Sequence, residues 1–304
     1  MGRFVAVICA VTVVGGAASF GVPAQANAVE RRGPAQSNWR DALVASIADP
    51  DQLPLGMNSP DCRSANGRRP VVLLNGAFLN KYATWSKFSP QLAGAGFCVY
   101  GLDYGGPADG PFHQVGDLRS SAREIKAFID GVRARTGSAE VDVVGYSEGG
   151  MVPLYYLNVL GGARAVRTLV TLAAPVRGMS GYGILDAVSA VPQARRALAS
   201  VLPAAVDGAA GSSYFAEVGE GGLTRPGVRY VSVSSVADLV VMPDEARFPA
   251  ARNVTNVVVQ DHCPQDHVFH GSIIYDDTAL GLVQNALEPA ADRVPRCTRR
   301  GPLG

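Results

Sequence analysis

The stretch VDVVGYSEGG, residues 141–150, decides the fold, because it runs from apolar residues into a serine flanked by glycines. Residues 141–144 are expected to form a buried strand. The largely apolar residues 151–160 predict a buried helix, kinked or loosened near Pro153. Ser147 then stands in a sharp turn between strand and helix, the context of a nucleophile elbow. An inert serine in a glycine-rich turn is the alternative; a phosphate-binding loop is disfavoured because no lysine follows.

Short apolar runs recur along the chain and indicate its fold class. The expected strands are 71–74, 97–102, 141–144, 166–172, 228–235 and 254–260, and the expected helices 38–47, 85–93, 117–135 and 151–160. This alternation predicts an α/β protein with a mainly parallel sheet covered by helices on both faces. Residues 176–226 break the alternation. We expect them to form a helical, lid-like insertion, with an ordinary surface excursion as the alternative.

The N-terminus of the 304-residue chain has the pattern of an export signal. Arg3 precedes an apolar stretch over residues 4–20, and Ala26-Asn27-Ala28 fits a cleavage site, so residues 1–28 are expected to be a signal peptide. A membrane anchor is the alternative, but the stretch is shorter than the ~20 residues that span a bilayer. Residues 29–304 then form one domain of a secreted protein.

Charge and cysteine content limit the function classes that remain. Without Arg3, the chain has 26 basic and 26 acidic residues, a balance that indicates neither nucleic acid nor anionic membrane as a partner. Four cysteines remain after export, and an even number favours disulfides, with three pairings possible. We expect the near-neighbour pairs Cys62–Cys98 and Cys263–Cys297. The lack of a Cys-x-x-Cys pair makes a zinc cluster an unfavourable interpretation.

A serine nucleophile needs a base, and three of the four histidines lie after the last expected strand. They are His262, His267 and His270, in the segment DHCPQDHVFH. A metal site that combines them with Asp266 is an alternative, although the segment contains Pro264 and lacks helical spacing. Histidines that are merely solvated are another.

The acid that orients the base is expected between the serine and the histidine in the chain, directly after a strand. Asp238 follows the expected strand 228–235 and meets this condition, with Asp244 as the second candidate and a turn-stabilising aspartate as the alternative. The oxyanion would be bound by two backbone N–H groups, those of Ala77 and Glu148. We assign the side chain of Glu148 no catalytic task beyond complementing the helix dipole.

The chain resembles the secreted α/β-hydrolase lipases and esterases of actinobacteria, the class 2 lipase group, over roughly residues 60–290. The matching segments are PVVLLNGAFLNKYATWSKFSPQLAGAGFCVYGLDYG, VDVVGYSEGGMVPLYY, ADLVVMP and VVVQDHCPQDHVFH. The resemblance implies an α/β-hydrolase fold with Ser147 as nucleophile, Asp238 as acid and His270 as base, and it matches all four cysteines. One departure is Asn75, where the family usually has histidine. Altered loop rigidity or substrate preference is expected there, rather than lost chemistry.

The sequence therefore predicts a secreted serine carboxylic-ester hydrolase, a lipase or esterase that acts on lipid or other hydrophobic esters. A Ser-His-Asp triad would act through an acyl-enzyme, and this chemistry needs no metal or organic cofactor. The expected partner is the substrate, with no membrane span and only transient contact with a lipid interface. An acyltransferase that uses the same triad and a non-catalytic binding protein on a hydrolase scaffold are the alternatives.

Overall fold

The computed structural model describes residues 31–63, 67–107, 110–181, 185, 188, 190–291 and 293–301. The expected signal peptide, residues 1–28, lies outside the described residues, as do several positions of the insertion 176–226.

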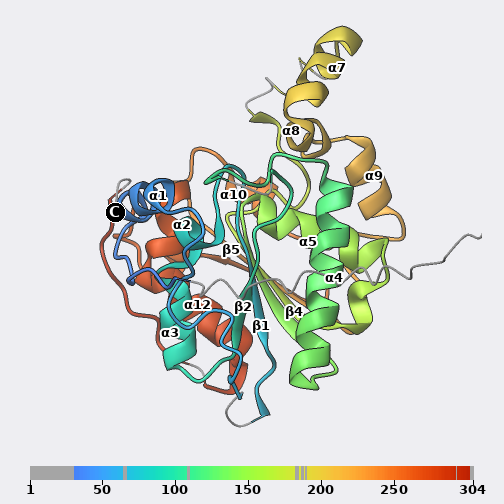
Figure 1. The fold of residues 1–304 in the computed structure, drawn as a ribbon. Helices are drawn as coiled ribbons and strands as arrows, with labels where there is room; N and C mark the ends of the chain where they lie inside the picture. Colours follow the sequence, from blue (N-terminus) through green and yellow to red (C-terminus); the bar gives the residue numbers. More distant parts are fainter. Residues whose placement is uncertain are drawn as a thin grey trace, which may run out of the picture. The chain divides into compact units, whose positions relative to one another are not determined.

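A six-stranded sheet forms the centre of the fold, and every neighbouring pair of its strands is parallel (Figure 1). The strands are β1 (Val71–Leu74), β2 (Val99–Gly101), β3 (Val141–Tyr146), β4 (Val166–Leu172), β5 (Arg229–Ser234) and β6 (Val254–Val258). Their spatial order is β2-β1-β3-β4-β5-β6. All six expected strands are present. The strand β2 is shorter than expected, and β3 is longer: it continues to the residue before Ser147 and so places the serine at the end of the sheet.

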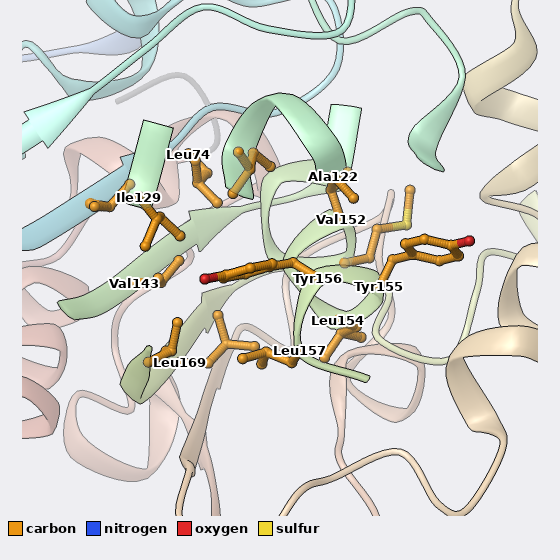
Figure 2. Packing of buried hydrophobic residues seen from close by; sticks show 14 of the residues in the cluster. Leu74, Ala122, Ile129, Val143, Val152, Leu154, Tyr155, Tyr156, Leu157 and Leu169 are labelled. Atoms are coloured by element: carbon orange, nitrogen blue, oxygen red, sulfur yellow. The ribbon is translucent and has the colours of Figure 1, made fainter. Parts of the chain in front are cut away.

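Helices cover both faces of this sheet. On one side lie α4 (Leu118–Thr136) and α5 (Glu148–Asn158), and on the other α3 (Phe88–Gly94) and α12 (Asp277–Leu287) (Figure 1). Successive residues of a strand point to opposite faces, so Val72 and Leu74 pack with α4 and α5, whereas Val71 and Leu73 pack on the other side. Figure 2 shows the first of these cores, where Ile129 of α4 and Val152 of α5 meet the sheet.

Outside the insertion 176–226, the other described helices mostly connect larger elements. They are α1 (Trp39–Ala48), α2 (Lys81–Trp85), α10 (Pro243–Ala246), α11 (Val259–His262), and the 3-10 turns Gly162–Arg164, His270–Tyr275 and Pro289–Ala291. The helix expected over residues 85–93 is confirmed as α3 from Phe88 onward, but the chain breaks at residues 86–87, and residue 85 ends the separate helix α2. Likewise, the strand expected to reach residue 260 ends at 258, where α11 begins.

The described part of the insertion includes the helices α7 (Pro192–Val201), α8 (Pro203–Asp207) and α9 (Ser213–Gly219). No residue of α7 is buried, and the helix packs against α8. Arg119 of α4 holds α8 and α9 in place. Its guanidinium donates to Asp207 of α8 at 2.9 Å and also forms an ion pair with Glu217 of α9. The insertion is therefore anchored at α8 and α9, while α7 projects from the body (Figure 1).

Two disulfides join segments that are close in sequence. Cys62 pairs with Cys98 beside β2, and Cys263 pairs with Cys297 near the C-terminus. This is the near-neighbour arrangement. The first bond ties the segment before β1 to an edge strand, and the second ties the C-terminal tail to the segment that follows α11.

Candidate active site

Ser147 occupies the turn between β3 and α5 in a backbone conformation that non-glycine residues rarely adopt. Its φ is 52° and its ψ is −124°, and its N–H donates to the carbonyl of Leu172 at 2.9 Å. Neighbouring glycines make the turn possible: a Cβ at Gly145 would lie 2.0 Å from the carbonyl oxygen of Gly149, and one at Gly149 2.3 Å from that of Leu74. A strained serine in such a turn is the geometry of a nucleophile elbow.

The side chains of Ser147, His270 and Asp238 form one continuous chain of hydrogen bonds. The Nε2 atom of His270 lies 3.0 Å from Ser147 Oγ, and its Nδ1 atom lies 2.8 Å from Asp238 Oδ2. An ionised carboxylate can only accept, so it selects the tautomer that carries its proton on Nδ1. Nε2 then has a free lone pair directed at the serine hydroxyl, which is what a general base requires.

Asp238 and His270 are each held by further hydrogen bonds. The Oδ1 atom of Asp238 accepts from the backbone N–H groups of Val240 at 2.8 Å and Val241 at 3.0 Å, and its side chain is only 1% exposed. The hydroxyl of Tyr146 donates to the carbonyl oxygen of His270 at 3.0 Å, and the two rings lie 5.2 Å apart. Asp238 is thus held by the backbone of its own loop, and His270 by Tyr146, the last residue of β3.

The other candidate residues lie away from this chain of hydrogen bonds. His262 and His267 are exposed, and Asp244 is an exposed residue of the short helix α10. Asp266 is buried but bonds backbone and a threonine rather than a histidine. Among the described residues, no group of three or more His, Cys, Asp or Glu side chains is arranged to hold a metal ion.

The loop after β1 lies next to the serine. The Asn75 side chain is buried and donates from Nδ2 to the carbonyl of Leu79 at 2.7 Å, which confirms that asparagine can brace this loop from within. Phe78 has a φ of 60°, and its N–H donates to the carbonyl of His113 at 2.9 Å. Ala77, between them, faces the same cavity as Ser147.

Sequence reasoning missed the burial of two polar side chains beside the serine, those of Glu148 and Gln114. Burial, followed by the negative charge of Asp207, raises the pKa of Glu148 well above its usual range. The neutral acid is therefore favoured, and the expected charge complement to the helix dipole is wrong. Gln114 is fully buried with a φ of 63°. No motif or periodicity signals either one, because their burial depends on how α4, α5 and α8 pack.

A cavity of about 340 Å³ opens next to Ser147 and is lined mainly by apolar side chains. Its walls come from the elbow, the loop after β1 and the insertion, and comprise Ala77, Phe78, Gln114, Tyr146, Ser147, Glu148, Met151, Pro175, Met179, Leu185, Leu202, Ala204, Ala205, Gly208, Val240 and His270. Residues of the insertion supply much of the apolar lining. The cavity suits a hydrophobic group bound next to the serine hydroxyl.

Parallel sheet, nucleophile elbow and chain of hydrogen bonds together define an α/β-hydrolase. The chain belongs to the class 2 lipase family, whose family model, described as Lipase (class 2), matches residues 68–280. Membership in this family supports the activity of a lipase- or esterase-type hydrolase.

Solved structures with the same fold include two lipases. Aspergillus fumigatus lipase B is similar with a TM-score of 0.61 and 19% identity, over 92% of this chain and 62% of that one. Bacillus licheniformis lipase BlEst2 in its mature form has a TM-score of 0.55 and 15% identity, over 74% of this chain and 94% of that one. The present chain thus spans less than two thirds of the fungal lipase. A comparison with curated proteins gives no match.

Proposed function

We propose that this protein is a secreted serine ester hydrolase that cleaves hydrophobic esters with Ser147 as nucleophile, His270 as base and Asp238 as the orienting acid. One observation carries the proposal: the unbroken path from Ser147 Oγ to His270 Nε2 at 3.0 Å and from His270 Nδ1 to Asp238 Oδ2 at 2.8 Å. Membership in the class 2 lipase family supports the same activity.

In the proposed reaction, Ser147 Oγ attacks the ester carbonyl while His270 Nε2 takes the hydroxyl proton. Asp238 stabilises the imidazolium that forms. The N–H groups of Ala77 and Glu148 bind the oxyanion, and the N-terminal end of α5 adds a favourable dipole. His270 then gives its proton to the leaving alcohol, and an acyl-enzyme remains. Water, activated by the same histidine, releases the acid and restores the serine.

The lining of the cavity supports a hydrophobic acyl group as the part of the substrate bound beside Ser147. Met179, Leu185 and Leu202 come from the insertion and present apolar side chains to it. Large apolar side chains are also exposed around the opening: Phe78 is 50% exposed and Val240 41%. We therefore assign residues 176–226 to the acyl-binding wall, and we expect the exposed rim to touch a lipid surface during turnover.

Secretion is supported by two independent features. The N-terminal residues have the pattern of a cleavable signal, and two disulfides such as those at Cys62–Cys98 and Cys263–Cys297 persist in oxidising compartments. In the part of the chain that the structure describes, no helix has the length and apolar character of a bilayer span.

The activity is tested with p-nitrophenyl esters of increasing acyl length and with a fluorophosphonate probe that labels activated serines. Wild type is expected to hydrolyse the esters and to be labelled, and Ser147→Ala to do neither. Ser120→Ala, which alters an exposed serine of α4, is the matched control and should behave as wild type. Failure of wild type to react with the probe would overturn the proposal. Product analysis with an added alcohol separates hydrolysis from acyl transfer.

A further inference from the structure

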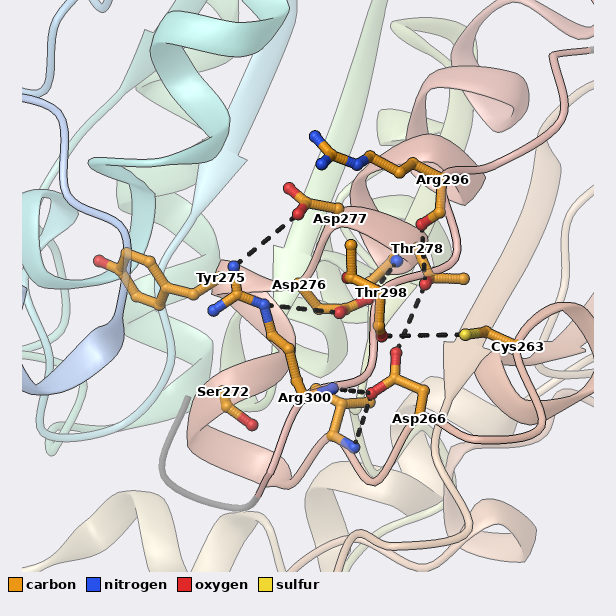
Figure 3. A network of polar contacts seen from close by, with 12 residues as sticks. Cys263, Asp266, Ser272, Tyr275, Asp276, Asp277, Thr278, Arg296, Thr298 and Arg300 are labelled. Carbon is orange, nitrogen blue, oxygen red and sulfur yellow. Dashed lines mark hydrogen bonds and ion pairs between the residues drawn. The ribbon is translucent and has the colours of Figure 1, made fainter.

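The loop that carries His270 begins and ends at two buried aspartates. Asp266 and Asp276 are each 0% exposed, and the 3-10 turn His270–Tyr275 lies between them in the chain. Figure 3 shows that both side chains belong to one polar network. The two carboxyl groups lie close enough to form a hydrogen bond with each other, so this contact joins the two ends of the loop.

The hydrogen bonds around Asp276 leave one oxygen without a donor. Its Oδ1 accepts from the N–H of Ala279 at 2.6 Å, but Oδ2 receives no hydrogen bond from any donor in the described part of the chain. The guanidinium of Arg300 stays 3.8 Å from Oδ2. A buried carboxylate oxygen without a partner is strongly unfavourable, so this atom needs a proton or a donor.

Asp266 cannot supply that donor while it is ionised. Its Oδ1 accepts from the N–H groups of Val268 at 3.1 Å and Arg300 at 3.4 Å, and its Oδ2 from the hydroxyl of Thr278 at 3.4 Å. Asp266 is thus well placed to be the ionised member of the pair, and Asp276 the protonated one. Two buried carboxyl groups in contact are not both charged without a large cost in free energy.

We propose that Asp266 and Asp276 share one proton, and that this carboxylic acid–carboxylate hydrogen bond is a positioning device for His270. The part that concerns catalysis rests on the function proposed above; the shared proton itself does not. Both aspartates act through the loop and touch neither the serine nor the substrate.

The charged groups around Asp266 and Asp276 favour a proton bound between them. Burial, with a further contribution from the neighbouring Asp266, raises the pKa of Asp276 to about 7, although the N–H of Ala279 and the charge of Arg300 act in the other direction. The nearby ammonium of Lys87 pairs with Asp277 and so does not neutralise the pair directly. Loss of the shared proton at higher pH leaves two like charges in contact, which separates the two ends of the loop.

A series of hydrogen bonds connects Asp266 with Asp238, the acid of the proposed triad. The carbonyl of Val268, next to the Asp266 contact, accepts from the hydroxyl of Ser235 at 2.7 Å, and the carbonyl of Ser235 accepts from the N–H of Asp238 at 3.2 Å. A shift of the loop therefore changes both the position of His270 and its bond to Asp238. A misplacement of about 1 Å in such a group lowers the rate by roughly a hundredfold.

The catalytic consequence is tested by the pH dependence of kcat on a short, soluble ester. Wild-type kcat is expected to fall as the pair loses its proton above neutral pH. Asp276→Asn, whose amide donates to Asp266 in place of the proton, should keep neutral activity and lose this alkaline fall. Asp276→Ala should lower kcat by roughly a hundredfold with little change in KM. Asp261→Asn changes an exposed aspartate nearby and should retain the wild-type profile.

An infrared measurement tests the proton without relying on activity. Just below neutral pH, the difference spectrum of wild type minus Asp276→Asn should show the C=O stretch of a protonated carboxylic acid, because the buried Glu148 contributes equally to both proteins. Absence of that band from the difference spectrum would refute the shared proton, whether or not the protein hydrolyses esters. If the band is present but Asp276→Asn keeps the same alkaline fall in kcat as wild type, the positioning role is refuted. A wild type that hydrolyses no ester removes that role together with the proposed function.

Discussion

Replacing Gly145 by alanine tests the role of the elbow with a displacement that follows from the structure. The added Cβ would lie 2.0 Å from the carbonyl oxygen of Gly149, whereas real Cβ contacts essentially never fall below 3.0 Å. This contact is with a backbone atom, which cannot move aside as a flexible side chain could. The turn must therefore open by about 1 Å. Displacing Ser147 by this amount from His270 is expected to lower kcat roughly a hundredfold.

The assay is hydrolysis of a short p-nitrophenyl ester, combined with thermal unfolding to establish that the variant is folded. Gly131→Ala is the matched control, because a Cβ there meets nothing within 4 Å and the residue lies inside α4. This control should keep full activity and gain about 0.5–1 kcal/mol of stability from the higher helix propensity of alanine. A folded Gly145→Ala with activity within threefold of wild type would show that the elbow does not fix the serine.

Three further predictions concern the acid, the cavity and the buried aspartates. Asp238→Asn should lower kcat by roughly 10⁴-fold with little change in KM, because the amide favours the wrong tautomer of His270; steady-state kinetics with soluble ester measure this. Leu185→Ala removes an apolar wall and should lower kcat/KM roughly tenfold for long acyl esters but little for acetate; equal losses on both would contradict an acyl-binding wall. In wild type, the free energy of unfolding should fall by at most about 4 kcal/mol as pH rises from about 4 to about 7, since the folded pKa of Asp276, about 7, exceeds its usual 3.8. Denaturant titrations of wild type and Asp276→Asn check this, and the variant should show a smaller fall.

The fold could be predicted from local patterns because each strand is a short apolar run bounded by turn residues. At β1, four apolar residues end at Asn75-Gly76, and the strand occupies those four positions. At the break between α2 and α3, apolar content continues through both helices. The helix expected over 85–93 is confirmed from Phe88 onward, and it misses the break at Ser86 and Lys87, a buried polar pair with hydrogen bonds to Tyr275.

The candidate site could be predicted only in part for a related physical reason. Ser147 sits within a local motif, and the position of Asp238 after a strand follows from the order of the elements. The choice among the three histidines does not follow from the order of the elements, because His262, His267 and His270 differ in where the folded loop directs them. In this sequence the family resemblance, not spacing, singled out His270.

Glu148 illustrates how a residue type can mislead when its burial is unknown. An acidic residue in the first turn of a helix normally complements the positive end of the dipole. Here the side chain is buried beside the site where an oxyanion is proposed to form, and an ionised carboxylate there would repel that charge. The raised pKa of Glu148 keeps the neutral acid favoured, so the N-terminal end of α5 retains its positive potential. Burial has thus reversed the usual electrostatic role of the residue, and only the packing of the surrounding helices reveals it.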